Sequence, residues 1–475
     1  MLRVFGHHIS TRAVAFAAFE VFAFIAIYNI SRAFVLNVVF PGSMDTYGHT
    51  YLLPLCSLIA FSTASSCGLY NKEMCSDPNR IVPRLLTVSA LMYFLMAVVI
   101  MVAGLVFTDT GRLNLYYVIT LTSAAGYFVA AFLFRQNAFR LNFNNTSMER
   151  RVLVVGVDEC AAKIDYLNGA SRSPYAVVGF VPVQNEVRSR RLGAYKVISG
   201  EILDTPIGLH DRARELRVDE IVVASREREG LPIGALMECR LAGITVTEFA
   251  SFWERQTGQI ELEEFNPNWL VFSDGFSTSW ALSIAKRVFD ILLAFILLLV
   301  TLPITAVAAI AVRLDGPGPL FYQQERVGLH GESFSIFKFR TMRVDAEKDG
   351  VPRWAENNDC RITRVGRFLR RARIDEIPQV INVLMGTMSF VGPRPERPIF
   401  VQALKQKIPH YDIRHRIKPG ITGWAQVNYP YGASDEDAKA KLAYDLYYAK
   451  NWGLFLDSVI LFQTARVVLW PDGVR

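Results

Sequence analysis

The sequence lacks the cysteine patterns of a metal site or of a disulfide framework. Its six cysteines include no Cys-x-x-Cys pair and form no His/Cys cluster with the spacing of a zinc site. We therefore interpret them as free thiols in a reducing compartment, and we expect no structural metal. We also expect no cleavable signal peptide, because the first long apolar segment is too long for one and lacks a small-residue cleavage site.

A glycine-rich dinucleotide loop is missing as well. After Gly156, which ends an apolar run, the second and third glycine positions of such a loop hold Asp158 and Ala161, and Asp158 would repel a pyrophosphate. None of the 18 tyrosines is followed four residues later by a lysine. These absences argue against NAD-dependent chemistry, including that of membrane-anchored nucleotide-sugar dehydratases.

What the chain has in excess is apolar residues. They make up 51% of the sequence, and the mean hydropathy of +0.23 is high for a soluble enzyme. A length of 475 residues suggests about three structural units at roughly 150 residues each. The net charge of +7 fits a membrane surface or phosphate groups better than nucleic acid, so we expect no nucleic-acid partner.

The N-terminal part predicts a bundle of four transmembrane helices over residues 1–140. Basic residues gather before the first apolar segment, between the second and third, and after the fourth, so the positive-inside rule places both ends in the cytoplasm. Glu20 is costly in lipid, and we predict that it faces other helices as a buried packing partner. The segments, each about long enough to span a bilayer, are Val14–Leu36, Tyr51–Tyr70, Leu85–Phe107 and Leu113–Phe134.

Residues 150–250 predict a small cytoplasmic α/β module. Strand-like runs alternate with helical ones, which is typical of a mostly parallel, Rossmann-like sheet. Because the dinucleotide loop is absent, we favour a structural, regulatory or dimerising role over nucleotide binding. Residues 251–282 have no clear periodicity and contain Asn266-Pro267-Asn268, so we interpret them as a linker.

The apolar run over residues 283–312 is long enough to be a fifth transmembrane helix, yet we favour a re-entrant one. Basic residues flank both ends, with Lys286 and Arg287 before the run and Arg313 after it. Pro303 removes a backbone hydrogen bond in mid-run and favours a bend. Asp290 could pair with Lys286 or Arg287, or form part of a site for an anionic lipid head group.

Two adjacent carboxylates, Asp375 and Glu376, follow a run of arginines and precede Pro378, which suits the first turn of a new helix. A helix N-terminus favours negative charge, including phosphate. The nearby cations would keep both carboxylates ionised at neutral pH. Taken alone, such a pair is more typical of a solvated salt-bridge surface, so its surroundings must decide its role.

Those surroundings carry a resemblance. Lys286-Arg287-x-x-Asp290 is followed in order by a predicted hairpin ending in Phe337-Lys338-Phe339-Arg340-Thr341-Met342, the Asp375-Glu376 stretch, Val391-Gly392-Pro393-Arg394-Pro395 and Lys418-Pro419-Gly420. Residues 283–475 thereby resemble the bacterial sugar transferase family, the monotopic polyprenyl-phosphate phosphoglycosyl transferases. The four spans and the α/β module make the whole chain similar to the long form of that family.

The resemblance implies an α+β catalytic domain over residues 313–475, carried by a re-entrant helix on the cytosolic side of the bacterial inner membrane. It implies transfer of a hexose-1-phosphate from a UDP-sugar to undecaprenyl phosphate with release of UMP. This reaction would begin a repeat unit of exopolysaccharide, capsule or O-antigen. A homodimer through the spans or the module is also expected.

The resemblance assigns roles to individual residues. Asp375 matches the family's nucleophile, which forms a covalent aspartyl-phosphosugar intermediate, and Glu376 matches the residue associated with Mg²⁺. We expect Lys286, Arg287 and Asp290 near the polyprenyl phosphate. The basic residues expected to contact phosphate or substrate are Lys338, Arg340, Arg370, Arg394 and Lys418.

One departure concerns the donor. Many short members continue Gln-Val-Asn with Gly-Arg, whereas Asn428 is followed here by Tyr429-Pro430-Tyr431-Gly432, so a basic active-site residue of those members has no counterpart. Asp457 and Arg466 interrupt the apolar C-terminal tail, which favours an amphipathic helix in the membrane interface. A membrane scaffold without catalytic activity is the alternative to a transferase.

Overall fold

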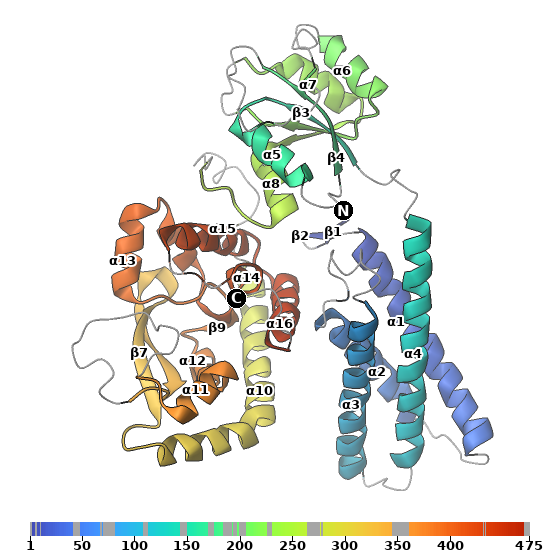
Figure 1. Cartoon of the computed structure of the whole chain (residues 1–475), viewed down its shortest axis with the longest axis vertical. Coiled ribbons are helices and arrows are strands. Elements are labelled where there is room, and N and C mark those ends of the chain that lie inside the picture. The colour runs from blue at the N-terminus through green and yellow to red at the C-terminus, as the bar shows by residue number, and fades with distance from the viewer. Residues whose placement is uncertain are drawn as a thin grey trace. The chain divides into compact units, whose positions relative to one another are not determined.

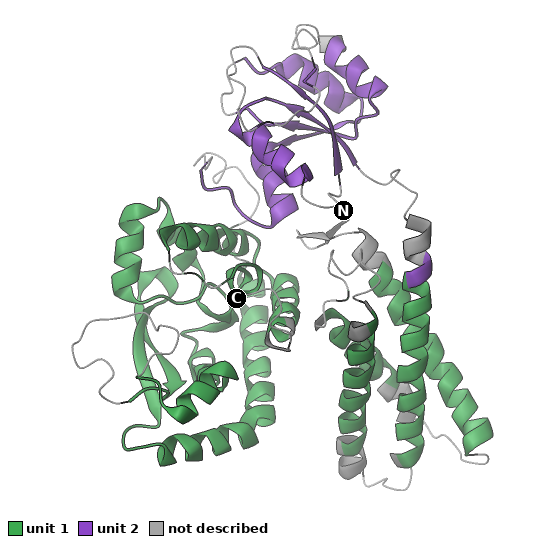
Figure 2. Cartoon of the chain, viewed as in Figure 1, with its two compact units in different colours: residues 1–135, 274–475 green, residues 136–273 purple. Residues whose placement is uncertain are grey.

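We describe the protein from a computed structural model, in which the chain forms two compact units (Figure 2). One unit comprises residues 1–135 and 274–475, and the other comprises residues 136–273. The structure describes the chain except for residues 1, 5, 6, 10, 41–47, 67, 68, 70–80, 108–112, 143–149, 170–174, 184–191, 193–196, 199–205, 226–229, 264–275, 277, 278, 344–360, 431, 433 and 470–475.

The N-terminal part of the first unit is helical, as predicted. Two short strands, β1 (Leu2–Val4) and β2 (His7–Ile9), precede α1 (Thr11–Phe34), which continues as the π-helix η1 (Val35–Val39). Then follow α2 (Gly48–Ser66), α3 (Ile81–Phe107) and α4 (Leu113–Asn142).

Two of these helices are long and apolar enough to cross a membrane. The candidate spans are Phe16–Val39 and Asn114–Asn137, and a third candidate, Trp280–Leu314, lies later in the chain. In α2 and α3 the described apolar stretches are shorter, Leu53–Ser65 and Leu85–Met101. The prediction of four spans therefore stays a prediction.

Glu20 lies in a polar network inside this helical part. It is 2% exposed, and its carboxylate accepts hydrogen bonds from Arg135 Nε at 2.7 Å and from the Tyr127 hydroxyl at 3.1 Å. Arg135 also donates to the Leu69 carbonyl at 2.9 Å. A charge in an apolar environment is tolerated when it is paired and hydrogen-bonded, so this network connects α1, α4 and Leu69, which follows α2, as expected for a buried packing partner.

The second unit contains a parallel sheet. Its strands are β3 (Arg150–Val155), β4 (Tyr175–Val181), β5 (Glu220–Val223) and β6 (Thr245–Glu248), in the order β4-β3-β5-β6 with every pair parallel. The helices are α5 (Glu159–Gly169), α6 (Pro206–Glu215), α7 (Ile233–Leu241) and α8 (Phe249–Thr257). The alternation of strands and helices predicted from the sequence is present. It allows helices to cover both faces of the apolar strands.

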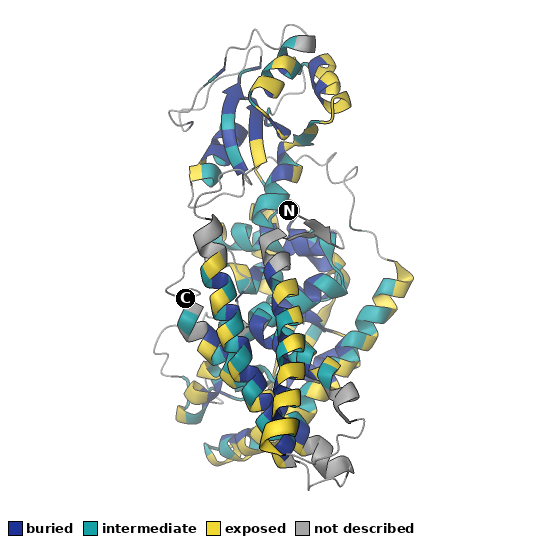
Figure 3. Cartoon of the chain, turned by 90° about the vertical axis from the view of Figure 1, so that its right-hand side faces the viewer, coloured by how far each residue is buried: buried dark blue, intermediate teal, exposed yellow. Residues whose placement is uncertain are grey.

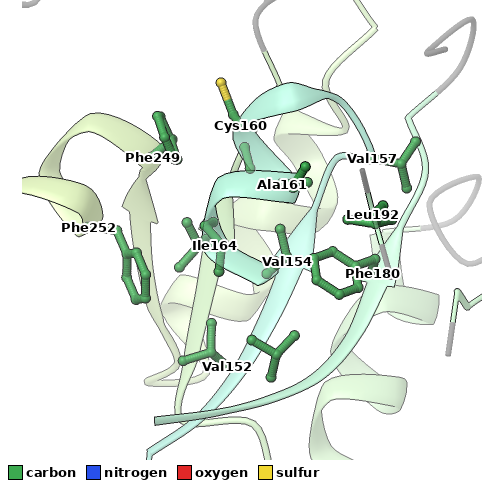
Figure 4. Close-up of a cluster of buried hydrophobic side chains, with 14 of the residues drawn as sticks. Val152, Val154, Val157, Cys160, Ala161, Ile164, Phe180, Leu192, Phe249 and Phe252 are labelled. Atoms are coloured by element: carbon green, nitrogen blue, oxygen red, sulfur yellow. The ribbon is translucent and has the colours of Figure 1, made fainter. Parts of the chain in front are cut away.

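The core of this unit lies on both faces of β3. On one face, Val152 and Val154 pack with Ile164 of α5 and Phe252 of α8, as Figure 4 shows. In Figure 3 the strands are mostly buried, whereas the outer helices carry exposed residues. Helix α8 occupies the first residues of the stretch that the sequence assigned to a linker, and Phe252 is fully buried there. The predicted Asn266-Pro267-Asn268 turn lies outside the described residues.

The β3–α5 turn keeps the first glycine of a dinucleotide loop and has an aspartate at the position of the second. Gly156 has φ +127°, and a Cβ there would lie 2.7 Å from the Ala224 carbonyl oxygen, so the close approach of β5 requires glycine. Asp158 Oδ1 accepts hydrogen bonds from the Cys160 and Ala161 amides at 2.8 and 3.2 Å. The side chain therefore takes the amide groups that a pyrophosphate would need, in agreement with the argument against dinucleotide binding.

Helix α10 (Trp280–Leu314) is one continuous helix of 35 residues that contains Pro303. Its ribbon bends sharply in Figure 1. The parts before and after Pro303 contact the same domain. Asp290 is hydrogen-bonded to β9 (Ser389–Val391), whereas Val312 packs in a cluster with Leu369 of α11 (Arg364–Arg371).

The remaining elements of the first unit follow α10 in the chain. The predicted hairpin is present as the antiparallel pair β7 (Phe321–Val327) and β8 (Ser333–Phe339), joined by η6 (Leu329–Gly331). Strands β9 and β10 (Gly420–Thr422) form a parallel pair. The remaining elements are η7 (Ile374–Glu376), α12 (Gln379–Met385), α13 (Pro398–Lys407), η8 (Tyr411–Arg416), α14 (Trp424–Asn428), α15 (Asp435–Asn451) and α16 (Leu454–Leu469).

Candidate active site

Asp375 and Glu376 lie on the short turn η7, directly before α12, as the position of Pro378 predicts. Arg373 begins the turn in the left-handed conformation, with φ +58° and ψ +16°. This region is unfavourable for residues with a side chain, and strained residues of this kind are often found at functional sites. The conformation reverses the chain between α11 and η7 and leaves the Arg373 side chain 61% exposed.

Glu376 is the centre of a cation cluster. Its carboxylate lies 2.8 Å from Lys338 Nζ, 3.4 Å from Arg394 Nη2 and 3.5 Å from Arg373 Nη1. Burial alone would raise the pKa of Glu376, but Arg394 and Lys338 outweigh it and hold the pKa well below its ordinary value. Lys338 is desolvated in turn, so burial lowers its pKa although Glu376 opposes the shift.

Asp375 differs from its neighbour. It is 8% exposed, and its Oδ1 atom is buried without a hydrogen-bond partner among the described residues. Burial, and then the negative charge of Glu376, raise its pKa, while Lys338 and Arg370 oppose the shift. The sequence predicted that the nearby cations would keep both carboxylates ionised at neutral pH. At Asp375, desolvation prevails over the cations.

Arg370 and Arg340 serve different parts of the domain. Arg370 donates through Nε to the Thr341 hydroxyl at 2.9 Å, and its charge acts on Asp375. Arg340 donates instead to the carbonyls of Val312, Gly316 and Pro317 at 2.6 to 2.9 Å. The structure therefore places Arg370 with the carboxylates and Arg340 on the loop that follows α10.

The beginning of α10 is anchored through Lys286. Its ammonium group lies 2.5 Å from Asp457 Oδ2 and donates to the Tyr448 hydroxyl at 3.2 Å. Tyr448 donates to Asp457 Oδ1 at 2.6 Å. The Asp457 side chain is fully buried, so the carboxylate that interrupts the apolar tail is paired in the protein interior. No local sequence pattern indicates this partner, which lies 171 residues from Lys286.

Three other residues complete what we call the α10 anchor, defined as Lys286, Arg287, Asp290, Lys418 and Asp457. Arg287 donates to the Val383 and Leu384 carbonyls, at 2.5 and 2.7 Å, near the C-terminus of α12. Asp290 accepts hydrogen bonds at 3.1 Å from the Ser389 hydroxyl and the Phe390 amide. Asp290 is thus hydrogen-bonded to a side chain and a backbone amide of β9.

Lys418 stands apart within the anchor because no hydrogen bond or ion pair reaches its ammonium group from the described part of the chain. Burial, then Arg287 and Lys286, lower its pKa, while Asp290 opposes the shift. A lysine beside two other cations has positive charge available for an anion. The α10 anchor therefore offers a candidate anion site.

Strand β9 joins the anchor to the carboxylates. The Val391 carbonyl oxygen accepts from Lys286 at 3.4 Å and lies 3.0 Å from the Tyr448 hydroxyl oxygen. Three residues further on, Arg394 reaches Glu376. Three residues span at most about 11 Å, so the anion site and the Asp375-Glu376 pair belong to one region of the domain.

A cavity of about 300 Å³ lies beside this region. Arg373 and Arg394, the partners of Glu376, form part of its wall. Arg414 supports Arg394 by donating to its carbonyl at 3.0 Å and pairing with Asp445 at 2.7 Å. Burial raises the pKa of Asp445 to about 6 although Arg414 opposes the shift. Other lining residues used below are Phe400, Gln426, Tyr429, Ala438 and Val467.

Sequence reasoning missed several of these residues. Arg373 was read only as part of an arginine run, and its left-handed backbone has no signal in the sequence. Asp457 was noted as an interruption of the apolar tail but was given no partner, although a lone carboxylate in an apolar helix needs one. Trp424 of α14 stacks on Tyr447 of α15 with ring centroids 5.8 Å apart.

Comparison with known proteins gives consistent matches. Residues 281–471 match the sequence profile described as Bacterial sugar transferase. Over 364 residues the chain is 34% identical to the UDP-N-acetylgalactosamine-undecaprenyl-phosphate N-acetylgalactosaminephosphotransferase of Aeromonas hydrophila, covering 76% of this chain and 81% of the relative. It is 32% identical over 333 residues to the UDP-glucose:undecaprenyl-phosphate glucose-1-phosphate transferase of Klebsiella pneumoniae, covering 68% of both chains. Against the Escherichia coli (strain K12) transferase of that name, 181 residues are 45% identical, covering 38% of this chain and 39% of the relative.

Proposed function

Because the chain belongs to the bacterial sugar transferase family, in its long form, we propose that it transfers a sugar-1-phosphate from a UDP-sugar to undecaprenyl phosphate and releases UMP. The chain is thus an undecaprenyl-phosphate sugar phosphotransferase. The observation that carries the mechanism is the buried Asp375, whose Oδ1 has no partner among the residues that the structure describes, next to a carboxylate held by three cations.

Asp375 is the nucleophile in this proposal. One carboxylate oxygen bonds to the sugar-proximal phosphorus of the donor while the anhydride bond to the other phosphorus breaks. The bridging oxygen keeps the electron pair and leaves with UMP. An oxygen of undecaprenyl phosphate then attacks the same phosphorus, and the carboxylate leaves. No proton needs to be removed from either nucleophile, which suits two groups that are already anionic.

The cations around Glu376 serve to neutralise the donor diphosphate. Attack by an anion on a diphosphate requires compensating charge at the phosphoryl oxygens. Arg373 and Arg394 reach Glu376 and also line the cavity, so they can contact phosphate on the cavity side. Lys338 of β8 contacts the same Glu376 oxygen as Arg394, and the charge of Arg370 acts on Asp375.

A magnesium ion fits this set of donors. Among the described residues no group of three or more metal-ligating side chains occurs, which suits Mg²⁺ because it is commonly held by one or two carboxylates, water and substrate phosphates. Glu376 would hold it, beside the unpaired Asp375 Oδ1. When bound, the ion would supply further positive charge at the phosphates. Loss of UMP release on chelation, restored by added Mg²⁺, would support this assignment.

The α10 anchor provides the phosphate site of the lipid substrate. Lys286 and Arg287 are engaged by Asp457 and by α12, so they fix the helix and contribute charge. Lys418 is the cation left to bind phosphate. Directly after the anchor residues, α10 has exposed apolar side chains, including Leu292 and Phe295, which are 58% and 61% exposed. These side chains could contact the hydrocarbon chain of the lipid substrate.

The same contacts support a re-entrant α10 with the catalytic domain in the cytosol. A straight helix of 35 residues would be about 52 Å long, and its two ends would be far apart. Here both ends contact one domain, and the exposed apolar residues Leu299 and Val300 lie between them. A cysteine at Gly316 should react only with reagents that reach the cytosol. Labelling from the periplasm would show that α10 spans the inner membrane.

The decisive test of function is UMP release by the purified protein from a panel of UDP-sugars with undecaprenyl phosphate. Asp375→Asn should abolish it, whereas a scaffold would keep its cellular phenotype after this change. Undiminished UMP release by the variant would rule out the covalent route. The panel also identifies the donor, because the named relatives use different sugars. Homodimerisation, which the sequence favours, is tested by the mass of the protein in nanodiscs.

A further inference from the structure

The cavity beside Glu376 has the size and lining of a small-ligand site. Its volume of about 300 Å³ is at the lower end of the range for ligand pockets, roughly 300–1,000 Å³. Much of its wall is apolar or aromatic, with Phe400 of α13, Ala438 of α15 and Val467 of α16 among the lining residues. Tyr429 also lines it, and its hydroxyl is held by Asp437 at 2.9 Å.

Two buried polar atoms of the lining residues, Arg414 Nε and Gln426 Oε1, have no hydrogen-bond partner in the part of the chain that the structure describes, and Gln426 Oε1 is the acceptor of the two. Gln426 Oε1 is buried and accepts no hydrogen bond from the residues that the structure describes. The amide orientation is set because Nε2 donates to the Ile421 carbonyl at 3.3 Å. Buried side-chain acceptors are nearly always satisfied, so an unpaired one in a cavity wall indicates a ligand that donates an N–H or O–H group there.

The positive charge is at the side that adjoins the catalytic carboxylates, where Arg373 and Arg394 lie between the cavity and Glu376. The ligand should therefore carry phosphate at one end and a flat, mostly apolar group with a hydrogen-bond donor at the other. A nucleoside monophosphate has this chemistry. A hexose is covered with hydroxyl groups and fits an apolar, aromatic wall less well.

We propose that this cavity binds the nucleotide half of the donor. The phosphate of the departing UMP lies against Arg373 and Arg394, and Gln426 Oε1 accepts a hydrogen bond from N3–H of uracil. Cytosine has an unprotonated N3 and would face this oxygen with a second acceptor, so Gln426 selects uracil. The inference rests on the proposed function and adds the place and the residue that recognise the nucleotide.

Binding of UMP to the full-length protein in nanodiscs, measured by calorimetry, tests whether this cavity is the nucleotide site. Ala438→Leu fills the cavity and should weaken UMP binding by about tenfold or more. Ala440→Leu is the matched control, because Ala440 is on the same helix but does not line the cavity. It should leave the affinity unchanged. Equal UMP affinity in the wild type and Ala438→Leu would overturn the proposal.

The ratio of UMP to CMP affinity tests whether Gln426 recognises the base. We expect the wild type to prefer UMP by about tenfold or more, and Gln426→Met to reduce that preference severalfold. A general loss of folding would lower both affinities without changing their ratio, so the ratio separates recognition from stability. An unchanged ratio would remove Gln426 from base recognition.

Two further outcomes separate this inference from the proposed function. If Ala438→Leu weakens a UDP-sugar relative to UDP but leaves UMP binding intact, the cavity holds the sugar and the inference fails while the function stands. If the wild type neither binds UMP nor turns over any UDP-sugar, the proposed function fails and the inference fails with it.

Discussion

Replacing Lys286 by methionine should strongly destabilise the catalytic domain. The Lys286 ammonium lies 2.5 Å from a carboxylate whose side chain is fully buried, Asp457, and the lysine side chain itself is 14% exposed. Removing one partner of a buried pair leaves an uncompensated charge, which costs about 3–5 kcal/mol. For a domain of this size about 1 kcal/mol shifts the melting temperature by roughly 2–4 °C, so the expected loss is roughly 6–20 °C.

The double variant Lys286→Met/Asp457→Leu should recover most of this loss. With both charges gone, an apolar pair in the same space is often as stable as the ion pair or more so. The measurement is thermal unfolding of the purified protein in detergent, followed by tryptophan fluorescence. The four proteins of the cycle give the coupling between the two residues.

Lys405 provides the matched control. It pairs with Asp412 at 2.6 Å, a similar distance, but the two side chains are 39% and 61% exposed. Exposed pairs contribute about 0–1 kcal/mol, so Lys405→Met should melt within a few degrees of the wild type. The reasoning is refuted if Lys286→Met melts like Lys405→Met, or if the double variant is as unstable as the single one.

Other predictions concern the reaction. Burial raises the pKa of Asp375, and the proposed nucleophile must be ionised. The value of kcat/KM should therefore fall on acidification through a pKa above the ordinary aspartate value of about 3.9, while Glu376, with its lowered pKa, stays ionised. An acid limb of the pH profile at or below that value would contradict this. Glu376→Gln should lower UMP release by about 10²-fold or more because it removes the charge that holds three cations; rates within twofold of the wild type would count against the cluster. Lys418→Met should slow transfer to undecaprenyl phosphate but leave the single-turnover burst of UMP intact, and a reduced burst would place Lys418 at the donor instead.

Much of the fold could be predicted because it depends on local patterns. Alternating apolar runs gave the parallel strands of the second unit, and the cations of the Lys338 segment fell on a hairpin. Pro378 correctly placed the two carboxylates before a helix. Each of these features is decided within a few residues by periodicity, β-propensity or a fixed φ angle.

The rest of the site depends on contacts between distant segments. Asp457 pairs with a lysine 171 residues away, and no local pattern specifies such a partner. Arg340 was grouped with the phosphate-binding cations, but the path of the chain after α10 brings backbone carbonyls to its guanidinium group. The left-handed backbone at Arg373 follows from how two helical segments must meet, which the composition of the segment does not reveal.

The contrast between Asp375 and Glu376 explains how two adjacent carboxylates can do different work. Three cations compensate Glu376, so its charge is stable and poorly basic. Asp375 is buried, has no partner at Oδ1 within the described part of the chain and has a raised pKa, so its oxygen is the more basic and the more nucleophilic. In the proposed covalent mechanism a single nucleophile serves both half-reactions, so UMP has to leave before the lipid phosphate can attack the same phosphorus. Initial rates measured against both substrates should therefore give the parallel lines of ping-pong kinetics, whereas intersecting lines would require both substrates to be bound together.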